Sequence, residues 1–195
     1  IQVKIGEESE ILLRGKTITK GYYKKPEETA KAFDADGWFH TGDIGYIKGG
    51  ELFMTGRLKD LFKTSNGKYI APQALESRMV IDQYIDQIAL IADQRKFVSA
   101  LIVPVYSKVE EYAKEHKIEY GSMEELLKNP DILEMFKRRI DTLQQQFAYY
   151  EQIKRFTLLT EPFSMKREEL TNTLKIRRQV IAKNYKDVID KMYKI

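Results

Sequence analysis

The chain has 195 residues, of which 43% are hydrophobic and 32% charged, a balance typical of a folded globular domain rather than a disordered or fibrous protein. The net charge is +4. Basic and acidic residues are interleaved along the chain, which indicates a solvated surface of mixed charge and argues against a nucleic-acid partner. Cysteine is absent and histidine occurs only as His40 and His116, so disulfide frameworks, thiol chemistry and the usual zinc sites are excluded or unsupported.

Residues 1 to 58 are predicted to be mostly β structure. A strand pair is indicated by "IQVKI" and "EILLRG", which flank the turn-like "GEES". Pro26 can open a short helix that stops near Asp36–Gly37. A tight hairpin is predicted in "IGYIKGGELFMTG", because apolar and polar residues alternate on both sides of Gly49–Gly50 and both glycines can adopt positive φ. Since the chain starts inside an apolar alternation, we expect it to be a piece of a longer protein.

The pattern changes after about residue 60. Pro72 can open a helix that runs to about Val80. Strands that pair across "DQRKF" are predicted for "QIALIAD" and "VSALIVPV", which are short and almost continuously apolar. Two short helices are predicted from capping-box spacings, which are Ser107 with Glu110 and Ser122 with Glu125.

Longer elements follow in the last third of the chain. A helix beginning at Asn129–Pro130 carries one buried stripe made of Ile132, Phe136, Ile140, Leu143 and Phe147. A strand is predicted for "KRFTLLT". A closing helix is predicted for "TLKIRRQVIAKNYKDVIDKMY", with a buried side made of Ile176, Val180, Val188 and Met192. The predicted fold class is therefore α+β.

Three charged residues are candidates for chemistry. The Asp43 carboxylate can accept both hydrogen bonds of a cis-diol while the Arg57 guanidinium bonds the same ring from its other edge, so together they can grip a ribose. In the alternative interpretation, Asp43 caps a turn and Arg57 makes a surface ion pair. Lys175 lies where Asn172 or Thr173 could begin a helix, so its ammonium could project from a helix start.

Three ordered motifs carry a resemblance to a known family. These are "EILLRGKTITKGYYKKPEETAKAFDADGWFHTGD", "GRLKDLFKTSNGKYIAPQALE" and "YEQIKRFTLLTEPFSMKREELTNTLKIRR". Over essentially its whole length the chain resembles the C-terminal third of an adenylate-forming acyl-CoA synthetase, specifically of the long-chain fatty acid CoA ligase group. The resemblance implies that residues 1–58 end the large AMP-binding domain as β hairpins of its barrel-like part. Residues 59–195 would be the small mobile α+β lid domain.

The resemblance also assigns roles to single residues. Asp43 and Arg57 match the residues that bind the ribose of AMP or ATP. Lys59 matches the hinge about which the lid domain rotates, and Gly67 falls in the loop that lies along the pantetheine of CoA. Lys175 matches the catalytic lysine that reaches the carboxylate and the α-phosphate during adenylation. No metal ligand is expected in this part of the protein.

The implied activity is ligation of a fatty acid to CoA through acyl-AMP, with ATP, CoA and Mg²⁺ as cofactors that bind mainly to the missing large domain. The chain alone is expected to be inactive and to expose apolar strand surface or self-associate. The first ten residues lack a signal-peptide pattern and no window approaches the roughly 18 apolar residues of a spanning helix, so we expect a cytoplasmic protein. Peripheral contact with the inner face of a membrane is compatible with this expectation.

Two alternative functions stay open, and the chain departs from the family pattern at two places. An adenylation module for another carboxylic acid would share the same residues, and a non-catalytic binding fragment belongs to a different class. Many relatives have glycine before the catalytic lysine, where this chain has Leu174. The loop "KTSNGKY" is one residue longer than in short-chain relatives, which affects the alignment of Gly67.

Overall fold

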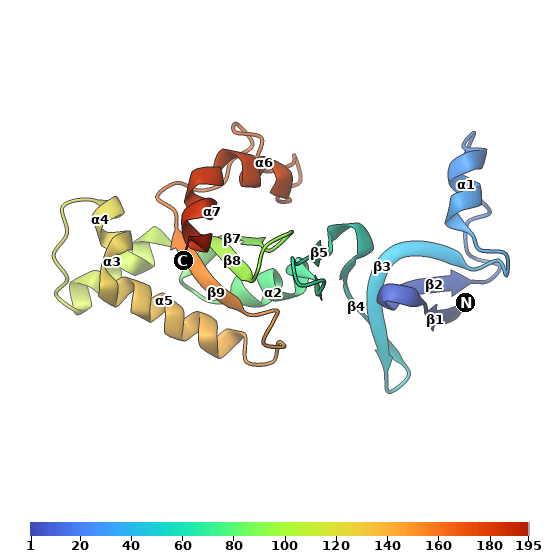
Figure 1. Ribbon diagram of the computed structural model, residues 1–195, viewed down its shortest axis with the longest axis horizontal. Helices are drawn as coiled ribbons and strands as arrows, with labels where there is room; N and C mark the ends of the chain where they lie inside the picture. Colours follow the sequence, from blue (N-terminus) through green and yellow to red (C-terminus); the bar gives the residue numbers. More distant parts are fainter. Residues whose placement is uncertain (195) are drawn as a thin grey trace. The chain divides into compact units, whose positions relative to one another are not determined.

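The computed structural model describes residues 1–194, and Figure 1 shows their helices and strands. The chain forms two compact units, of which the first comprises Ile1–Leu61 with Ala71–Ala74. The second comprises Phe62–Ile70 and the residues from Leu75 onward. Helices and strands are mixed along the chain, which confirms the α+β fold class.

The first unit contains a four-stranded antiparallel sheet in sequential order. Its strands are β1 (Gln2–Ile5), β2 (Glu10–Arg14), β3 (Phe39–Lys48) and β4 (Glu51–Arg57), and its short helices are η1 (Glu7–Ser9), α1 (Pro26–Ala32) and η2 (Leu58–Asp60). Both predicted strand pairs are confirmed. Helix α1 begins at Pro26 as predicted but ends before Asp36–Gly37, because Phe33 is already extended and bridges to Phe39.

The β3–β4 hairpin turns at Gly49 and Gly50, whose φ angles of 62° and 84° confirm the predicted glycine turn. Pairing starts with Lys48 opposite Glu51, and the register shifts by one residue between Ile44 and Gly45. A Cβ at position 45 would lie 2.2 Å from the Phe53 carbonyl oxygen, so the shift requires glycine there.

The second unit is built on a three-stranded sheet of order β7–β8–β9 and a small β5–β6 hairpin. Strands β7 and β8 are antiparallel, as predicted for a pair across the connecting turn, and β9 runs parallel to β8. The strands are β5 (Phe62–Lys63), β6 (Tyr69–Ile70), β7 (Ile85–Ile91), β8 (Val98–Pro104) and β9 (Ile153–Leu158). The helices are α2 (Pro72–Met79), α3 (Tyr106–Glu115), α4 (Met123–Lys128), α5 (Pro130–Leu143), α6 (Arg178–Asn184) and α7 (Lys186–Tyr193).

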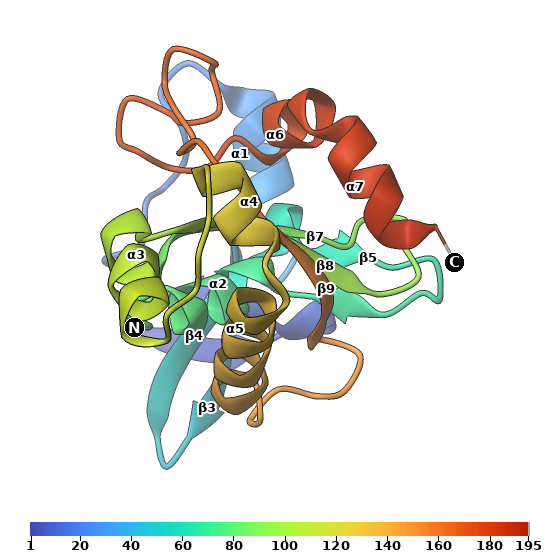
Figure 2. The same cartoon turned by 90° about the vertical axis from the view of Figure 1, so that its left-hand side faces the viewer.

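Helices cover both faces of this sheet, and Figure 2 shows α5 and α7 on either side of it. One face carries Ile88 and Ile102, which pack in a cluster with residues of α2, α3, α4 and α5. The other face carries Ala89 and Leu101, which pack with residues of α6 and α7. Every residue of β8 is buried, which explains the almost continuous apolar run that predicted this strand.

The two capping-box predictions have different outcomes. The Ser122 hydroxyl accepts from the Glu125 amide and caps α4, as predicted. The Ser107 prediction is wrong, because α3 begins at Tyr106 and Ser107 already lies in its first turn. Val105 stands at the cap position without a side-chain hydrogen bond, since the chain becomes helical directly after β8.

The prediction of one long closing helix is also wrong in where the helix begins, in its being unbroken and in most of its buried residues. The helical residues form α6 and α7, separated at Tyr185 with φ −107° and ψ 22°. Met192 is buried as predicted, but the other buried side chains are Ile181 and Ile189, whereas the predicted Ile176, Val180 and Val188 are only half-buried. Helix α5 begins at Pro130 with Asn129 as its cap, as predicted, but ends at Leu143, before Phe147.

No helix within residues 1–194 combines the length and the apolar composition needed to cross a membrane.

Apolar side chains are exposed on the β3–β4 hairpin, as expected for residues 1–58. We call Tyr46, Ile47, Leu52, Phe53 and Met54 the hairpin patch; the exposed fraction reaches 68% at Met54. The rings of Tyr46 and Phe53 stack with their centroids 5.2 Å apart. Because neighbouring residues of a strand point to opposite faces, Tyr46 and Phe53 lie on one face of the hairpin and Ile47, Leu52 and Met54 on the other. Exposed apolar surface on both faces is typical of an element that another protein part covers.

We expect the 195-residue chain to self-associate through the hairpin patch. Replacing both Phe53 and Met54 by lysine should shift the chain toward monomer in sedimentation velocity, because burial of a charge in the contact is unfavourable. The matched control is Tyr23→Lys, since Tyr23 is 85% exposed but outside the patch. A parent chain that sediments as a monomer would count against this prediction.

Candidate functional site

Asp43 and Arg57 lie opposite each other on β3 and β4. The Arg57 Nε atom donates to Asp43 Oδ1 over 3.0 Å, and the side chains are 53% and 27% exposed, respectively. Asp43 Oδ2 accepts no hydrogen bond from residues 1–194. The surface ion pair of the alternative interpretation therefore exists, but it joins the two candidates to each other and leaves one carboxylate oxygen for an outside donor.

A buried glutamate holds the backbone beside Asp43. The Glu10 carboxylate accepts from the Gly42 amide over 2.9 Å and lies 2.8 Å from His40 Nδ1. The Thr41 hydroxyl donates to the Ile11 carbonyl and accepts from the Asp43 amide. Strand β2 thus fixes the segment that presents Asp43. Sequence reasoning missed Glu10, because nothing in "GEESE" distinguishes it from the exposed glutamates beside it.

Lys59 and Gly67 lie in short connecting segments. Lys59 is exposed within η2, shortly before the chain enters the second unit at Phe62. Gly67 lies in the β5–β6 loop with φ 75°, and its amide donates to the Thr64 carbonyl over 2.9 Å. The Thr64 hydroxyl accepts from the Lys68 amide and closes the same loop.

Lys175 projects from a turn of residues 171–175, here called the lysine turn, and its side chain is exposed. The Thr171 amide donates to the Lys175 carbonyl over 2.8 Å, and the Lys175 amide donates to the Thr171 hydroxyl over 3.0 Å. The predicted helix start at Asn172 or Thr173 is therefore wrong, and the first helical residue is Arg178. Leu174 adopts φ 59° in this turn.

A second buried glutamate supports the base of the lysine turn. The Glu169 carboxylate accepts from the Ser164 amide, from Arg167 Nε and from Asn184 Nδ2. Its backbone carbonyl accepts from the Arg177 amide over 2.8 Å. Burial raises the pKa of Glu169, but these hydrogen bonds, that from Arg167 first, outweigh it and leave the pKa below its ordinary value. The carboxylate therefore stays ionised and holds both ends of the segment around the turn.

A third glutamate joins the segment after the lysine turn to the sheet. Glu76 on α2 accepts from the Leu90 amide of β7 over 2.8 Å. Both of its oxygens also accept from Arg178, the first residue of α6, with the second contact at 2.5 Å. The Glu76 and Arg178 side chains are only 10% and 20% exposed. This bidentate pair fixes where α6 begins, and so fixes the base of the lysine turn.

Within residues 1–194, histidine and acidic side chains form no group of three or more that could hold a metal ion.

We expect Glu76→Ala to lower the free energy of unfolding by about 3–5 kcal/mol, because it leaves the Arg178 guanidinium buried without its partner. Glu134→Ala removes an exposed pair with Arg138 and should cost about 0–1 kcal/mol. Urea denaturation followed by circular dichroism measures both values. Equal losses in the two variants would contradict the role given to Glu76.

The chain is similar in sequence to several long-chain acyl-CoA synthetases. It is 35% identical over 188 residues to long chain acyl-CoA synthetase 7, peroxisomal, of Arabidopsis thaliana, covering 94% of this chain and 27% of that protein. It is 34% identical over 197 residues to long-chain-fatty-acid–CoA ligase 5 of Mus musculus, covering 97% and 28%. The chain therefore spans little more than a quarter of the length of these relatives.

Solved structures of related enzymes match the fold. The A domain of carboxylic acid reductase from Segniliparus rugosus, in complex with AMP and a co-purified carboxylic acid, matches 94% of this chain and 28% of its own. The TM-score is 0.69 and the sequence identity 25%. Apo MatB from Rhodopseudomonas palustris matches 95% of this chain and 31% of its own, with a TM-score of 0.56 and 25% identity.

A family model covers most of the chain. Residues 59–195 match the model described as the AMP-binding enzyme C-terminal domain. The matched range contains Lys59, Gly67 and Lys175, whereas Asp43 and Arg57 precede it. On this match over more than half of its length, the chain belongs to the family of AMP-binding enzyme C-terminal domains.

Proposed function

We propose that the chain is the C-terminal part of a long-chain fatty acid:CoA ligase. Residues 1–58 would end the large AMP-binding domain, and residues 59–195 would form its mobile lid domain. The observation that carries the proposal is the exposed cross-strand pair of Asp43 and Arg57, which precedes an AMP-binding C-terminal domain in a chain similar to long-chain ligases.

The proposed reaction has two steps. In the first, a fatty acid carboxylate oxygen attacks the α-phosphorus of ATP, an oxygen–phosphorus bond forms, and pyrophosphate leaves. In the second, the CoA sulfur attacks the acyl carbonyl, the thioester forms, and AMP leaves while the thiol proton is released. Mg²⁺ supplies charge neutralisation on the phosphates, and we expect its ligands mainly in the large domain.

Asp43 and Arg57 suit the ribose of the nucleotide. Asp43 Oδ2 can accept a hydroxyl hydrogen bond without disturbing the bond from Arg57 to Oδ1. Arg57 carries further N–H groups that can donate to the same ring. The pair would hold the nucleotide in one orientation during both steps.

Lys175 suits the first step. Its ammonium, at the exposed end of a hydrogen-bonded turn, would be directed at negative charge that develops around the α-phosphorus. A cation that gains most when this charge develops stabilises the transition state more than the bound substrates. The buried Glu169 and Glu76 pairs would keep the turn in place for this contact.

Lys59 and Gly67 suit the change between the steps. A few backbone dihedrals at Lys59 would turn the lid domain, so that the loop with Gly67 replaces the lysine turn at the acyl group and lies along the pantetheine of CoA. Because the chain would lack the acyl pocket and most of the nucleotide site, we expect it to be inactive alone. The cytoplasmic location stays a prediction, since the Arabidopsis relative is named peroxisomal.

A second candidate is adenylation of another carboxylic acid. The structural similarity to the A domain of carboxylic acid reductase, solved with AMP and a co-purified carboxylic acid, favours it. Both candidates use the same five residues, and substrate choice would lie outside this chain. Activation of palmitate by the full-length gene product supports the first candidate, whereas activation of only other acids supports the second.

We expect Lys175→Ala in the full-length protein to lower acyl-AMP formation by about 10²-fold or more, as for loss of one preorganised donor. Conversion of supplied acyl-AMP to acyl-CoA should be largely kept, since this step does not need the ammonium. Radiolabelled palmitate, with acyl-AMP and acyl-CoA scored separately, measures both steps. Lys166→Ala is the control, because Lys166 lies in the same segment before the lysine turn. Unchanged adenylation in Lys175→Ala would remove the lysine from the mechanism.

We expect Lys59→Pro to damage one of the two steps much more than the other, because proline fixes φ and favours one of two hinge conformations. Lys59→Ala removes the same side chain but keeps φ free, so it should retain most of both activities. The two half-reactions are measured as above. Equal loss of both in Lys59→Pro would contradict the hinge assignment.

A further inference from the structure

Strand β9 is the outer strand of its sheet, and one of its edges is open. It pairs with β8 on one side, and the order β7–β8–β9 ends there. The Leu159 amide donates to the Ile102 carbonyl of β8 over 2.8 Å. Because backbone groups alternate in direction along a strand, the amides of Phe156 and Leu158 point toward the open edge. The ladder to β8 therefore does not use these two amides, and neither of them donates to a turn, loop or side-chain group of residues 1–194.

A side chain already occupies the start of this edge. The register of β9 against β8 shifts between Val98 and Ser99, so Ile153, which precedes the shift, faces the open edge as Phe156 and Leu158 do. Gln144, which is 3% exposed, accepts from the Ile153 amide through Oε1 over 2.8 Å. Its Nε2 atom donates to the Ile153 carbonyl over 3.3 Å. One side-chain amide thus makes the two hydrogen bonds that a neighbouring strand would make to Ile153. The edge of β9 is therefore suited to strand pairing, and beyond Gln144 it has no occupant in the described residues.

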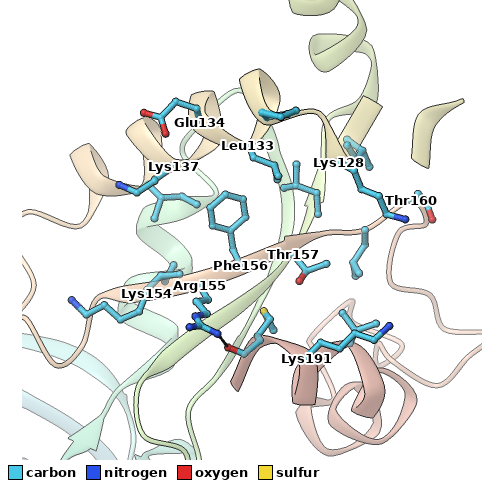
Figure 3. A pocket seen from close by; sticks show the side chains of 18 of the residues that line it. Lys128, Leu133, Glu134, Lys137, Lys154, Arg155, Phe156, Thr157, Thr160 and Lys191 are labelled. Atoms are coloured by element: carbon cyan, nitrogen blue, oxygen red, sulfur yellow. Dashed lines mark hydrogen bonds between the residues drawn. The ribbon is translucent and has the colours of Figure 1, made fainter. Parts of the chain in front are cut away.

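A groove follows the open edge. It has a volume of about 1090 Å³ and is lined by every residue of β9, by one side of α5 and by part of α7. Figure 3 shows β9 crossing the groove between these helices, with Phe156 directed toward α5. Six residues of strand span about 20 Å, and the groove extends over this whole length. An extended peptide therefore matches the shape of the groove.

The charges of the groove favour an acidic occupant. Its acidic side chains are already paired, Glu124 with Lys128 and Asp141 with Lys137. Glu134, the remaining one, pairs with Arg138.

Three cations of the groove form no ion pair with a carboxylate of residues 1–194. They are Lys154, Lys191 and Arg155, and the Arg155 guanidinium donates to the Met192 and Lys194 carbonyls. The groove therefore carries surplus positive charge along an apolar floor that includes Phe156 and Leu158.

We propose that β9 binds an extended segment of a partner protein, rich in acidic and apolar residues, as a fourth strand of the sheet. The backbone of the segment pairs with Phe156 and Leu158, its acidic side chains contact Lys154 and Lys191, and its apolar side chains contact the groove floor. A second copy of β9 fits less well, because its own Lys154 and Arg155 would add like charge. This proposal does not depend on the catalytic assignment.

The test uses the 195-residue chain and a short capped peptide of alternating glutamate and valine, labelled for fluorescence anisotropy. We expect saturable binding, together with slower hydrogen exchange at the amides of Phe156 and Leu158. The same peptide with its alternate backbone amides methylated keeps every charge but loses strand pairing, and should bind about tenfold more weakly. The double variant Lys154→Glu, Lys191→Glu should weaken binding of the unmodified peptide by at least as much.

A matched control separates local charge from general charge. Lys108→Glu with Lys114→Glu changes net charge equally on α3, outside the groove, and should leave binding unchanged. Equal affinity for the methylated peptide would overturn the proposal, because attraction would then be electrostatic only. Absent protection at Phe156 and Leu158, or protection caused by self-pairing without peptide, would overturn it as well.

Discussion

The buried Glu76 carboxylate is the contact on which the second unit depends most. It binds a backbone amide of the sheet and both arms of the Arg178 guanidinium, so one side chain joins α2, β7 and α6. None of these partners is near it in the sequence. Desolvation makes such a pair costly unless the buried oxygens are hydrogen-bonded, and here the amide and the guanidinium together donate to both oxygens. The position of the lysine turn follows from where this pair anchors α6.

In the first unit, the pairing register of β3 and β4 decides whether Asp43 and Arg57 meet. Lys48 pairs with Glu51, and without the shift at Gly45 the strands would place Asp43 opposite Gly56 instead of Arg57. A slip of one residue would also send the two side chains to different faces of the sheet. The close approach of position 45 to the Phe53 carbonyl therefore has a distant effect, because it brings a carboxylate and a guanidinium together at the other end of the hairpin.

Sequence patterns predicted the helices and strands whose formation depends on neighbouring residues in the chain. Alternation and paired glycines predicted the β3–β4 hairpin, and the apolar run predicted β8. The prediction of one long closing helix failed because hydrogen bonds within residues 169–177 hold this segment outside a helix. Residues 170 and 176 form a β-bridge, and the Arg177 amide donates to the Glu169 carbonyl. The sequence predicted Asp43 and Arg57 as candidate site residues, but it did not predict Glu10, which holds the backbone beside Asp43. A glutamate that will be buried, such as Glu76, has the same sequence appearance as an exposed one.

Leu174 lies in a strained part of the lysine turn. A leucine at φ 59° occupies a backbone region that costs a residue with a Cβ about 1–3 kcal/mol, and two hydrogen bonds to Thr171 hold the turn there. Glycine at this position would remove the cost but enlarge the ensemble of the unfolded chain, so the two effects on the free energy of unfolding oppose each other. The residue before Lys175 therefore sets the stiffness of the turn separately from the ammonium that the turn presents.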